Sequence, residues 1–202
     1  MEKIKKLRKI LKRENIDGYL IPKNDEFFSE NTPSHNDRLK YISNFSGSFG
    51  FSLILQNKNY LLVDGRYTLQ ATKQSGKFFK IINLQSKILK KNVTRKLNIG
   101  YDSKLFTKKT LNALLRNNNH EFIPIKNNLI DQIWKRKLKI NKKKFYILPS
   151  DSAGESYKSK IKKVVLNLKK NKADYQFISA SENNAWLLNI GGSDDAFAPI
   201  PF

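Results

Sequence analysis

Residues 49–63 read Phe49-Gly50-Phe51-Ser52-Leu53-Ile54-Leu55, Gln56-Asn57-Lys58-Asn59 and Tyr60-Leu61-Leu62-Val63. In the first run, aromatic residues or leucines alternate with smaller residues, and the last run is almost wholly apolar, as in two adjacent strands. The polar residues between the two runs have the composition of a turn. The stretch therefore predicts a β-hairpin.

Helices and strands alternate on both sides of this hairpin. Before it, residues 3–14 predict an amphipathic helix, with its apolar side chains at helical spacing, and residues 19–22 predict a short buried strand that ends at a proline. After it, residues 67–74 predict a helix that ends near Gly76, and residues 78–82 predict another strand. The apolar positions of the first helix are Ile4, Leu7, Ile10 and Leu11.

A second series of elements follows. Residues 97–101 and 122–125 predict strands, residues 107–116 predict a helix capped by Thr107, and residues 129–134 predict a short helix. Helices and strands in this mixed order are typical of an α/β sandwich around a mixed sheet. We therefore expect one α/β domain over residues 1–134.

A basic stretch over residues 135–144 has few apolar residues and lies between two patterned regions, which predicts a linker. Beyond it, residues 145–202 repeat the opening of the chain: a helical stripe precedes residues 171–178, whose sequence echoes residues 15–21. A further helix is expected after Ser181 as its cap, with Trp186 in its buried turn, as Trp134 is expected in the core. The stripe consists of Ile161, Val164, Val165 and Leu168.

Short motifs occur along the whole chain in a fixed order. They are Asp25-Glu26-Phe27-Phe28-Ser29-Glu30 with Arg38, residues 43–50, Asp64-Gly65-Arg66-Tyr67, residues 129–134, Ala153-Gly154-Glu155-Ser156 and residues 185–194. In this order they resemble the amino-terminal region of the Xaa-Pro aminopeptidases, the aminopeptidase P branch of the creatinase and prolidase family. The resemblance extends from one end of the chain to the other.

The resemblance implies a fold and its boundaries. It implies a creatinase/prolidase N-terminal domain of the ribonuclease H-like, mixed-sheet α/β type over residues 1–134, then a second lobe of the same type over residues 145–202. The family continues with another strand after this point, so we expect the second lobe to be truncated and its sheet incomplete. The family's pita-bread catalytic domain, which holds two divalent metals, usually manganese, is expected to be absent from this chain.

The resemblance also implies a function. The family removes the residue before a penultimate proline, so the expected partner of the full-length enzyme is a peptide with proline at its second position, and homo-oligomers are expected. This chain would shape the substrate cleft and subunit contacts, without catalytic or metal-binding residues of its own, and would be inactive alone. The alternative is a stand-alone creatinase-type binding module or a weak basic nucleic-acid-binding domain.

Arg66 is the one candidate site residue. Its planar guanidinium, projecting from a turn at Gly65, could grip a carboxylate or a peptide carbonyl, or it could simply pair with Asp64 and hold the turn together. The motif Asp64-Gly65-Arg66-Tyr67 alone favours the ion pair between Arg66 and Asp64, whereas the resemblance assigns Arg66 to substrate binding. The loop over residues 43–50 lacks the Lys of a phosphate loop, so its Gly47 and Gly50 indicate a close backbone approach.

Other polar residues give weaker signals. His35 and His120 have no second ligand at metal-binding spacing, and His120 is expected in a solvated turn. Asp25, Glu26 and Glu30 are explained by capping and by pairing with Arg38 rather than by acid–base catalysis. This sequence departs from the family's pattern near the end of the chain: most relatives carry Arg at the position where this chain has Gly191.

Composition limits the remaining classes. The formal charge of +22 comes mostly from lysines scattered over the helices and linkers, which indicates a biased composition rather than a specific nucleic-acid surface. No run of about 18 apolar residues and no secretory signal are present, so no membrane partner is expected. The absence of cysteine fits a reducing compartment, and we expect a cytoplasmic protein without a disulfide framework.

Overall fold

The computed structural model describes residues 2–28, 31–84, 96–115, 120–136, 144–194 and 198–201. Glu30, most of the expected linker and the end of the helix expected at 107–116 lie outside these ranges. The chain divides into two compact units. The first contains Met1–Glu26 and Ser34–Leu138, and the second contains Phe27–Pro33 and Lys139–Phe202.

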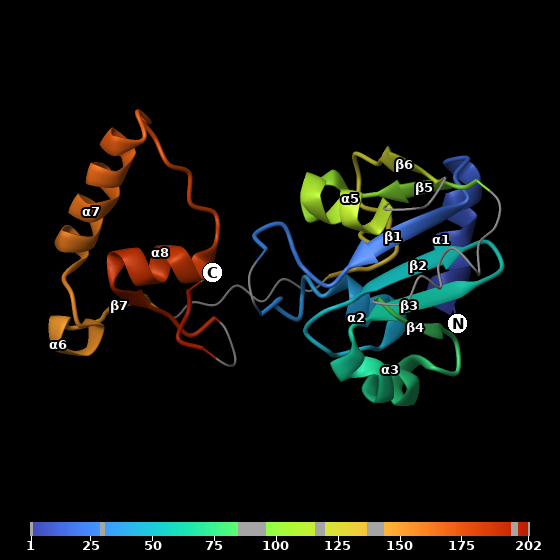
Figure 1. Cartoon of the computed structure of the whole chain (residues 1–202). Coiled ribbons are helices and arrows are strands. Elements are labelled where there is room, and N and C mark those ends of the chain that lie inside the picture. Colours follow the sequence, from blue (N-terminus) through green and yellow to red (C-terminus); the bar gives the residue numbers. More distant parts are fainter. Residues whose placement is uncertain are drawn as a thin grey trace. The chain divides into compact units, whose positions relative to one another are not determined.

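The first unit is built on a six-stranded mixed sheet with the order β4-β3-β2-β1-β5-β6 (Figure 1). The expected hairpin forms β2 and β3, and β1 and β3 flank β2 and pair with it antiparallel, in the registers Leu20↔Leu53 and Leu53↔Tyr60. The outer pairs β3–β4, β1–β5 and β5–β6 are parallel. The strands are β1 Gly18–Pro22, β2 Phe51–Leu55, β3 Asn59–Val63, β4 Lys80–Asn83, β5 Asn98–Tyr101 and β6 Glu121–Pro124.

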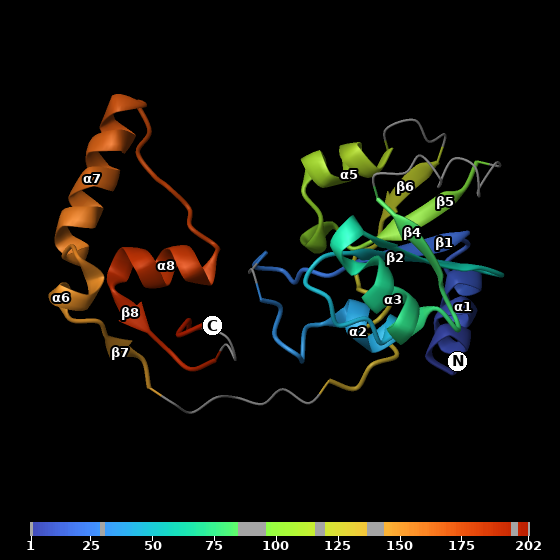
Figure 2. The ribbon, with the colours of Figure 1, turned by 60° about the horizontal axis from the view of Figure 1, so that its bottom comes forward.

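Both faces of this sheet are covered (Figures 1 and 2). One face packs against α1 Glu2–Arg13, α2 Arg38–Ser43 and α3 Thr68–Ser75, and the other packs against α5 Lys108–Leu115 and the 3-10 turn η2 Ser103–Leu105. Successive strand residues therefore belong to different cores: Tyr19 and Ile21 face the first layer, and Leu20 faces the second. Central strands buried on both faces explain the nearly continuous apolar runs of the sequence.

Most elements expected from the sequence of this unit are confirmed. Thr107 caps α5, because its hydroxyl accepts a hydrogen bond from the Thr110 backbone N–H at 3.1 Å. The helix expected over residues 129–134 is wrong: the backbone N–H groups of Ile133 and Trp134 both donate to the Ile130 carbonyl, which makes a single turn. The Asn128 side chain accepts from the Ile130 N–H and fixes this turn, while Trp134 stacks on Tyr41 at 4.7 Å.

The second unit is sparser. It contains β7 Tyr146–Ile147, α6 Ser150–Ala153, α7 Tyr157–Lys170, α8 Ser181–Leu188 and β8 Ile190–Gly191, and β7 pairs antiparallel with β8. Its elements are joined by the buried amine of Lys160 on α7, which donates to the Trp186 carbonyl at 2.8 Å and to Asn189 Oδ1 at 2.7 Å.

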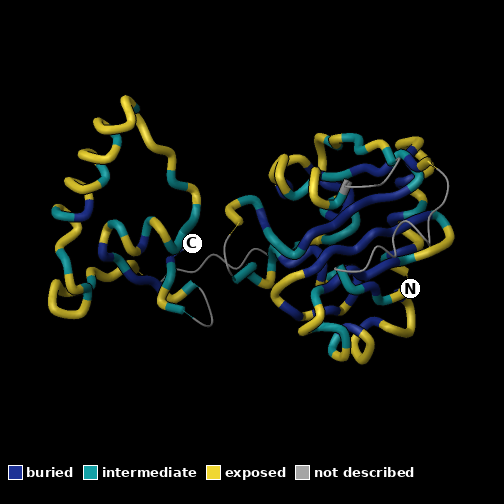
Figure 3. The backbone as a smooth tube through the Cα atoms, in the orientation of Figure 1, coloured by how far each residue is buried: buried dark blue, intermediate teal, exposed yellow. Residues whose placement is uncertain are grey.

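Two details of the second unit differ from the sequence expectation. Trp186 is 62% exposed rather than buried, and its ring lies 4.3 Å from the Lys160 amine. Helix α8 begins at Ser181 itself, with Ala180 as its N-cap and no side-chain cap. Residues 171–178 form no strand, although residues 18–22 of the related opening do. Figure 3 shows that this unit has far fewer buried residues than the sheet of the first unit.

Candidate functional site

Arg66 lies in the first unit, directly beyond the end of β3. The strand ends at Val63, and Asp64 caps the 3-10 turn η1 Gly65–Tyr67, with its carboxylate accepting a hydrogen bond from the Arg66 backbone N–H at 3.0 Å. This carboxylate cap, rather than glycine, makes the turn that the sequence assigned to Gly65. A Cβ at Gly65 would meet nothing closer than Asn83 at 3.6 Å, which is ordinary contact.

The Arg66 guanidinium forms an ion pair with Asp64. Its Nη2 donates to Asp64 Oδ2 at 2.7 Å and its Nε donates to Oδ1 at 3.2 Å, while its carbon lies 5.2 Å from the Tyr67 ring centre. The hydrogen bond from Arg66 lowers the pKa of Asp64 below its ordinary value, and desolvation of the carboxylate opposes this shift. The Arg66 side chain nevertheless remains 74% exposed, so one face of the fork meets solvent.

The loop between α2 and β2 packs beside this turn. Ser48 Oγ and Tyr67 Oη lie 2.7 Å apart in a hydrogen bond, and the Ser46 backbone N–H donates to Gln74 Oε1 at 2.9 Å. Gly47 passes so close to the Phe45 and Tyr67 rings that a Cβ there would lie 2.2 Å from Phe45 Cζ. The expectation of a close backbone approach at Gly47 is confirmed.

These contacts define a surface that we call the Arg66 corner: Arg66, Tyr67 and Ser48. It offers a guanidinium fork, a hydroxyl pair and an aromatic ring at one end of the β2–β3 hairpin. Such a set can bind a carboxylate or peptide carbonyl and pack against an apolar residue beside it. Whether Arg66 contacts substrate stays a prediction.

Arg38 belongs to a buried ion-pair network that the sequence indicated only in part. Its side chain is 1% exposed and grips Asp131 through Nε and Nη2, both at 2.9 Å, while Nη2 also donates to Glu26 at 2.6 Å. Burial alone would lower the pKa of Arg38, but the hydrogen bonds to Asp131 and Glu26 raise it above its ordinary value. The pairing with Glu26 was expected. Asp131 and its second partner Arg136 were missed because they lie far along the chain.

Histidine and acidic residues do not assemble a metal site in the described part of the chain, where no group of three or more potential ligands occurs. His35 lies in a turn before α2. His120, expected in a solvated turn, is partly buried beside β6; its Nδ1 is buried without a hydrogen-bond partner, and burial lowers its pKa. Among the described helices, none is long and apolar enough to cross a membrane.

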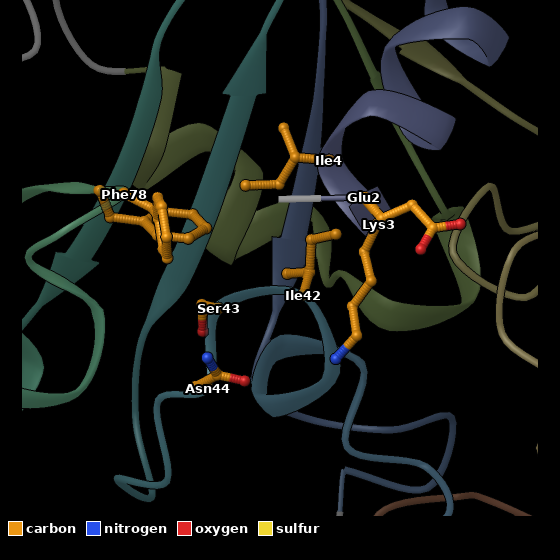
Figure 4. Close-up of a pocket in the computed structure, with 8 residues that line it drawn as sticks. Glu2, Lys3, Ile4, Ile42, Ser43, Asn44 and Phe78 are labelled. Atoms are coloured by element: carbon orange, nitrogen blue, oxygen red, sulfur yellow. The ribbon is translucent and has the colours of Figure 1, made fainter.

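A separate small pocket of about 200 Å³ lies between the start of α1 and the end of α2 (Figure 4). Lys3 and Ile4 face Ile42, Ser43 and Asn44 there, and the Lys3 amine is held by a hydrogen bond to the Tyr41 carbonyl at 2.9 Å. The pocket is smaller than typical ligand sites, which exceed roughly 300 Å³, and it does not include the Arg66 corner.

The chain belongs to the creatinase/prolidase N-terminal domain family. A model of this domain matches residues 3–133, and a second creatinase/prolidase N-terminal domain model matches residues 136–202. The first match covers the whole six-stranded sheet and includes the Arg66 corner.

Individual relatives are Xaa-Pro peptidases. The chain is 32% identical to Xaa-Pro aminopeptidase 1 of Dictyostelium discoideum over 98% of its own length and 35% of the relative's. The structure matches the X-prolyl aminopeptidase of Caenorhabditis elegans, described as a cytosolic enzyme with a di-nuclear active site, with a TM-score of 0.86 and 26% identity over 100% of this chain and 36% of that one. The Xaa-Pro dipeptidase of Bacillus anthracis matches with a TM-score of 0.52 and 27% identity over 66% of this chain and 35% of that chain. The chain thus spans about a third of the length of these relatives.

Proposed function

We propose that this chain is the non-catalytic amino-terminal portion of an Xaa-Pro aminopeptidase, in which it shapes the substrate cleft and contributes subunit contacts. The observation that carries the proposal is the structural match along the whole chain to an X-prolyl aminopeptidase, of which it covers the equivalent of 36%. The substrate of the longer enzyme would be a peptide with proline at its second position. The protein would act in the cytoplasm, as the relative from Caenorhabditis elegans is described to do.

The metal chemistry of such an enzyme would lie outside this portion. The described residues do not fit a dinuclear site, because they offer no cluster of three potential ligands. The two divalent ions, manganese by the resemblance, would activate water for attack on the bond before proline when held by the rest of the enzyme. The residues of this chain would bind and orient the peptide.

Arg66 is the residue that we assign to substrate. Its side chain is mostly exposed, and Asp64 and Tyr67 orient the fork without burying it. A guanidinium held in this way has lost part of its conformational freedom before a ligand arrives, so each new hydrogen bond costs less. The Arg–Asp pair and the substrate role are thus compatible rather than exclusive.

The experiment uses a chimaera of this chain with the remaining portion of the Dictyostelium discoideum enzyme. Arg66→Ala is expected to lower kcat/KM for a proline-containing tripeptide roughly ten- to hundredfold, because a charged hydrogen bond to peptide contributes about 1.5 to 3 kcal/mol. Arg66→Lys is expected to recover little, since it keeps the charge and loses the fork. The kinetics and the melting temperature are measured on the same samples.

Two results would contradict the assignment. Normal kcat/KM together with a lowered melting temperature in Arg66→Ala would make Arg66 a structural residue. Aminopeptidase turnover by the chain of residues 1–202 alone, with or without added manganese, would place chemistry in this portion. A homo-oligomer is the expected state of the longer enzyme, and light scattering would measure it.

A further inference from the structure

The chain passes between its two units three times: after Glu26, after Pro33 and after Leu138. We call these points the first, second and third passage. Residues 27–33 thus leave the first unit and return to it, and the third passage leads to the rest of the second unit. Boundaries between domains usually fall in flexible linkers that make few contacts. The residues of the first unit beside these passages are the opposite case, because they make close polar contacts with one another.

A buried ion pair of the first unit holds the residue before the first passage. Arg38 on α2 donates two hydrogen bonds of 2.9 Å to Asp131, and its Nη2 also donates to Glu26 at 2.6 Å. The Arg38 side chain is 1% exposed, while those of Asp131 and Glu26 are 25% and 31% exposed. Because Glu26 is the last residue before the first passage, its carboxylate fastens that point of the chain to the pair of Arg38 and Asp131.

Arg136 extends these contacts to the other two passages. Its Nη2 donates to Asp131 at 2.9 Å, and its Nη1 donates to Asn36 Oδ1 at 3.0 Å. Asn36 follows the second passage, and its Nδ2 donates at 3.3 Å to Asp25, which lies just before the first. Arg136 itself precedes the third passage, so one connected set of hydrogen bonds joins all three. We call this set the Arg38 cluster: Asp25, Glu26, Asn36, Arg38, Asp131 and Arg136.

The charges of the cluster act on one another as well. Desolvation raises the pKa of Glu26, but the hydrogen bond from Arg38 and the charges of Arg38 and Arg136 lower it below its ordinary value. Arg136 therefore stabilises the charged carboxylate of Glu26 without donating a hydrogen bond to it. This attraction links the residue before the first passage to the residue before the third.

The segment between the first two passages shows that it is held. Phe28 has a backbone φ of 56°, in the left-handed region that a bulky residue rarely adopts. Strained conformations of this kind persist where the surrounding structure imposes them. The Phe28 side chain is 43% exposed, so full burial of its ring does not impose this backbone. Glu26 and Asn36, on either side of the segment, provide the restraint.

We propose that the Arg38 cluster is a hinge anchor, which holds the three passages to one another so that loosening one of them loosens the others. Hinges consist of a few residues at the ends of elements and in loops, as these are. Glu26 and Arg136 are partly exposed, and ion pairs of this kind add little to stability. Either can be removed while the pair of Arg38 and Asp131 remains. Since every contact involved lies within the first unit, the inference does not depend on the proposed function.

The first test alters the third passage and observes the segment between the other two. Arg136→Ala in the chain of residues 1–202 is expected to speed early chymotrypsin cleavage after Phe28 at least about threefold, because cleavage requires local release of the segment. Product masses identify the bond that is cut, and cleavage after the 92%-exposed Phe177 serves as the internal reference. Arg136 is far from Phe28 in the sequence, so the protease meets the same residues around the bond.

The second test alters the first passage and observes the third. Because the chain has no cysteine, Lys135→Cys places a single nitroxide at an exposed position beside the third passage. Glu26→Ala is expected to shorten the rotational correlation time of this label roughly twofold in its electron paramagnetic resonance spectrum, because the segment that carries it moves more freely. The melting temperature of the first unit is measured on every variant.

Two ion pairs that include no member of the Arg38 cluster provide the matched controls. Glu121→Ala removes an exposed pair with Lys96, and Lys6→Ala removes an exposed pair with Glu2. Both controls are expected to leave the cleavage after Phe28 and the motion of the label unchanged.

The proposal is overturned if either readout stays unchanged in its test variant, or if a control alters it equally. It is also overturned if Arg136→Ala or Glu26→Ala lowers the melting temperature of the first unit more than the controls do. The cluster would then act through the stability of the sheet rather than by joining the passages.

Discussion

Two arginines of the first unit pair with aspartate in opposite environments. The Arg38 side chain is 1% exposed between Asp131 and Glu26, and the Arg66 side chain is 74% exposed beside Asp64. Removing one partner of a buried pair leaves an uncompensated charge, whereas an exposed pair competes with water at little net gain. The same chemical change should therefore have unequal effects on the free energy of unfolding.

We expect Arg38→Ala to lower the free energy of unfolding of the first unit by about 3 to 5 kcal/mol, and Arg66→Ala to lower it by less than about 1 kcal/mol. Urea denaturation of both variants, followed by circular dichroism, measures the difference. Equal losses would contradict the burial argument. If Arg38→Lys is as stable as the unaltered chain, then only the charge at this position matters, and not the two hydrogen bonds to Asp131.

At the scale of single elements, two glycines beside the Arg66 corner, Gly47 and Gly65, differ in a similar way. A Cβ at Gly47 would lie 2.2 Å from Phe45 Cζ and 2.9 Å from Tyr67 Cδ1, whereas at Gly65 the nearest atom is 3.6 Å away. Neither position needs a left-handed backbone, since Gly154 is the glycine with positive φ among those described. The two glycines therefore differ in the room that their surroundings leave for a Cβ atom.

Gly47→Ala is expected to lower the free energy of unfolding by about 1 to 3 kcal/mol, because the Phe45 and Tyr67 rings must shift. Gly65→Ala is expected to be neutral or stabilising by up to about 1 kcal/mol, because alanine restricts the unfolded chain. Thermal unfolding of the two variants gives the comparison. If Gly65→Ala proves the more harmful of the two, then η1 depends on its glycine for a reason other than contact.

The sequence predicts elements well where a local pattern determines them. The β2–β3 hairpin, α1, α3 and α5 are correct because apolar periodicity and turn residues act over short separations. The turn at residues 129–133 was mistaken for a helix because the Asn128 side chain, rather than the apolar pattern, directs its hydrogen bonds. Trp186 was mistaken for a buried residue, because its ring lies over the Lys160 amine and stays 62% exposed, a contact that no local pattern indicates.

In the candidate site, too, contacts between residues close in sequence could be predicted and contacts between distant residues could not. Arg66 and the close approach at Gly47 could be found from short motifs, and the pairing of Arg38 with Glu26 was within reach of a local argument. The hydrogen bond between Ser48 and Tyr67 could not be predicted from the sequence, because it joins two loops that only the folded hairpin brings together. Asp131 lies 93 residues from Arg38 along the chain, and no local pattern indicates such a pair.

At the scale of the whole molecule, the charge of +22 needs its own test. Lysines scattered along the chain can neutralise phosphates only diffusely, so we expect weak, sequence-independent binding to duplex DNA that is largely lost by about 0.2 M salt. Fluorescence anisotropy with two unrelated duplexes over a salt series measures this. Tight binding that persists at that salt concentration, or a clear preference for one duplex, would favour the nucleic-acid-binding alternative.

The last prediction concerns the independence of the two units. The first contains two extensive cores on the faces of its sheet, whereas Ala185 and Pro201 are the buried apolar side chains of the second among the residues described beyond 144. A segment of some 60 residues buries too little surface to be stable without a substantial core. Residues 1–138 alone should therefore unfold cooperatively, at a midpoint within about 4 °C of the first unit in the whole chain, which corresponds to a change below roughly 1 kcal/mol. Residues 145–202 alone should show no cooperative transition by calorimetry, although Lys160 can still hold α7 to α8 locally. A sharp transition in that fragment would mean that polar contacts of this kind suffice to fold it, and it would contradict the argument from its small core.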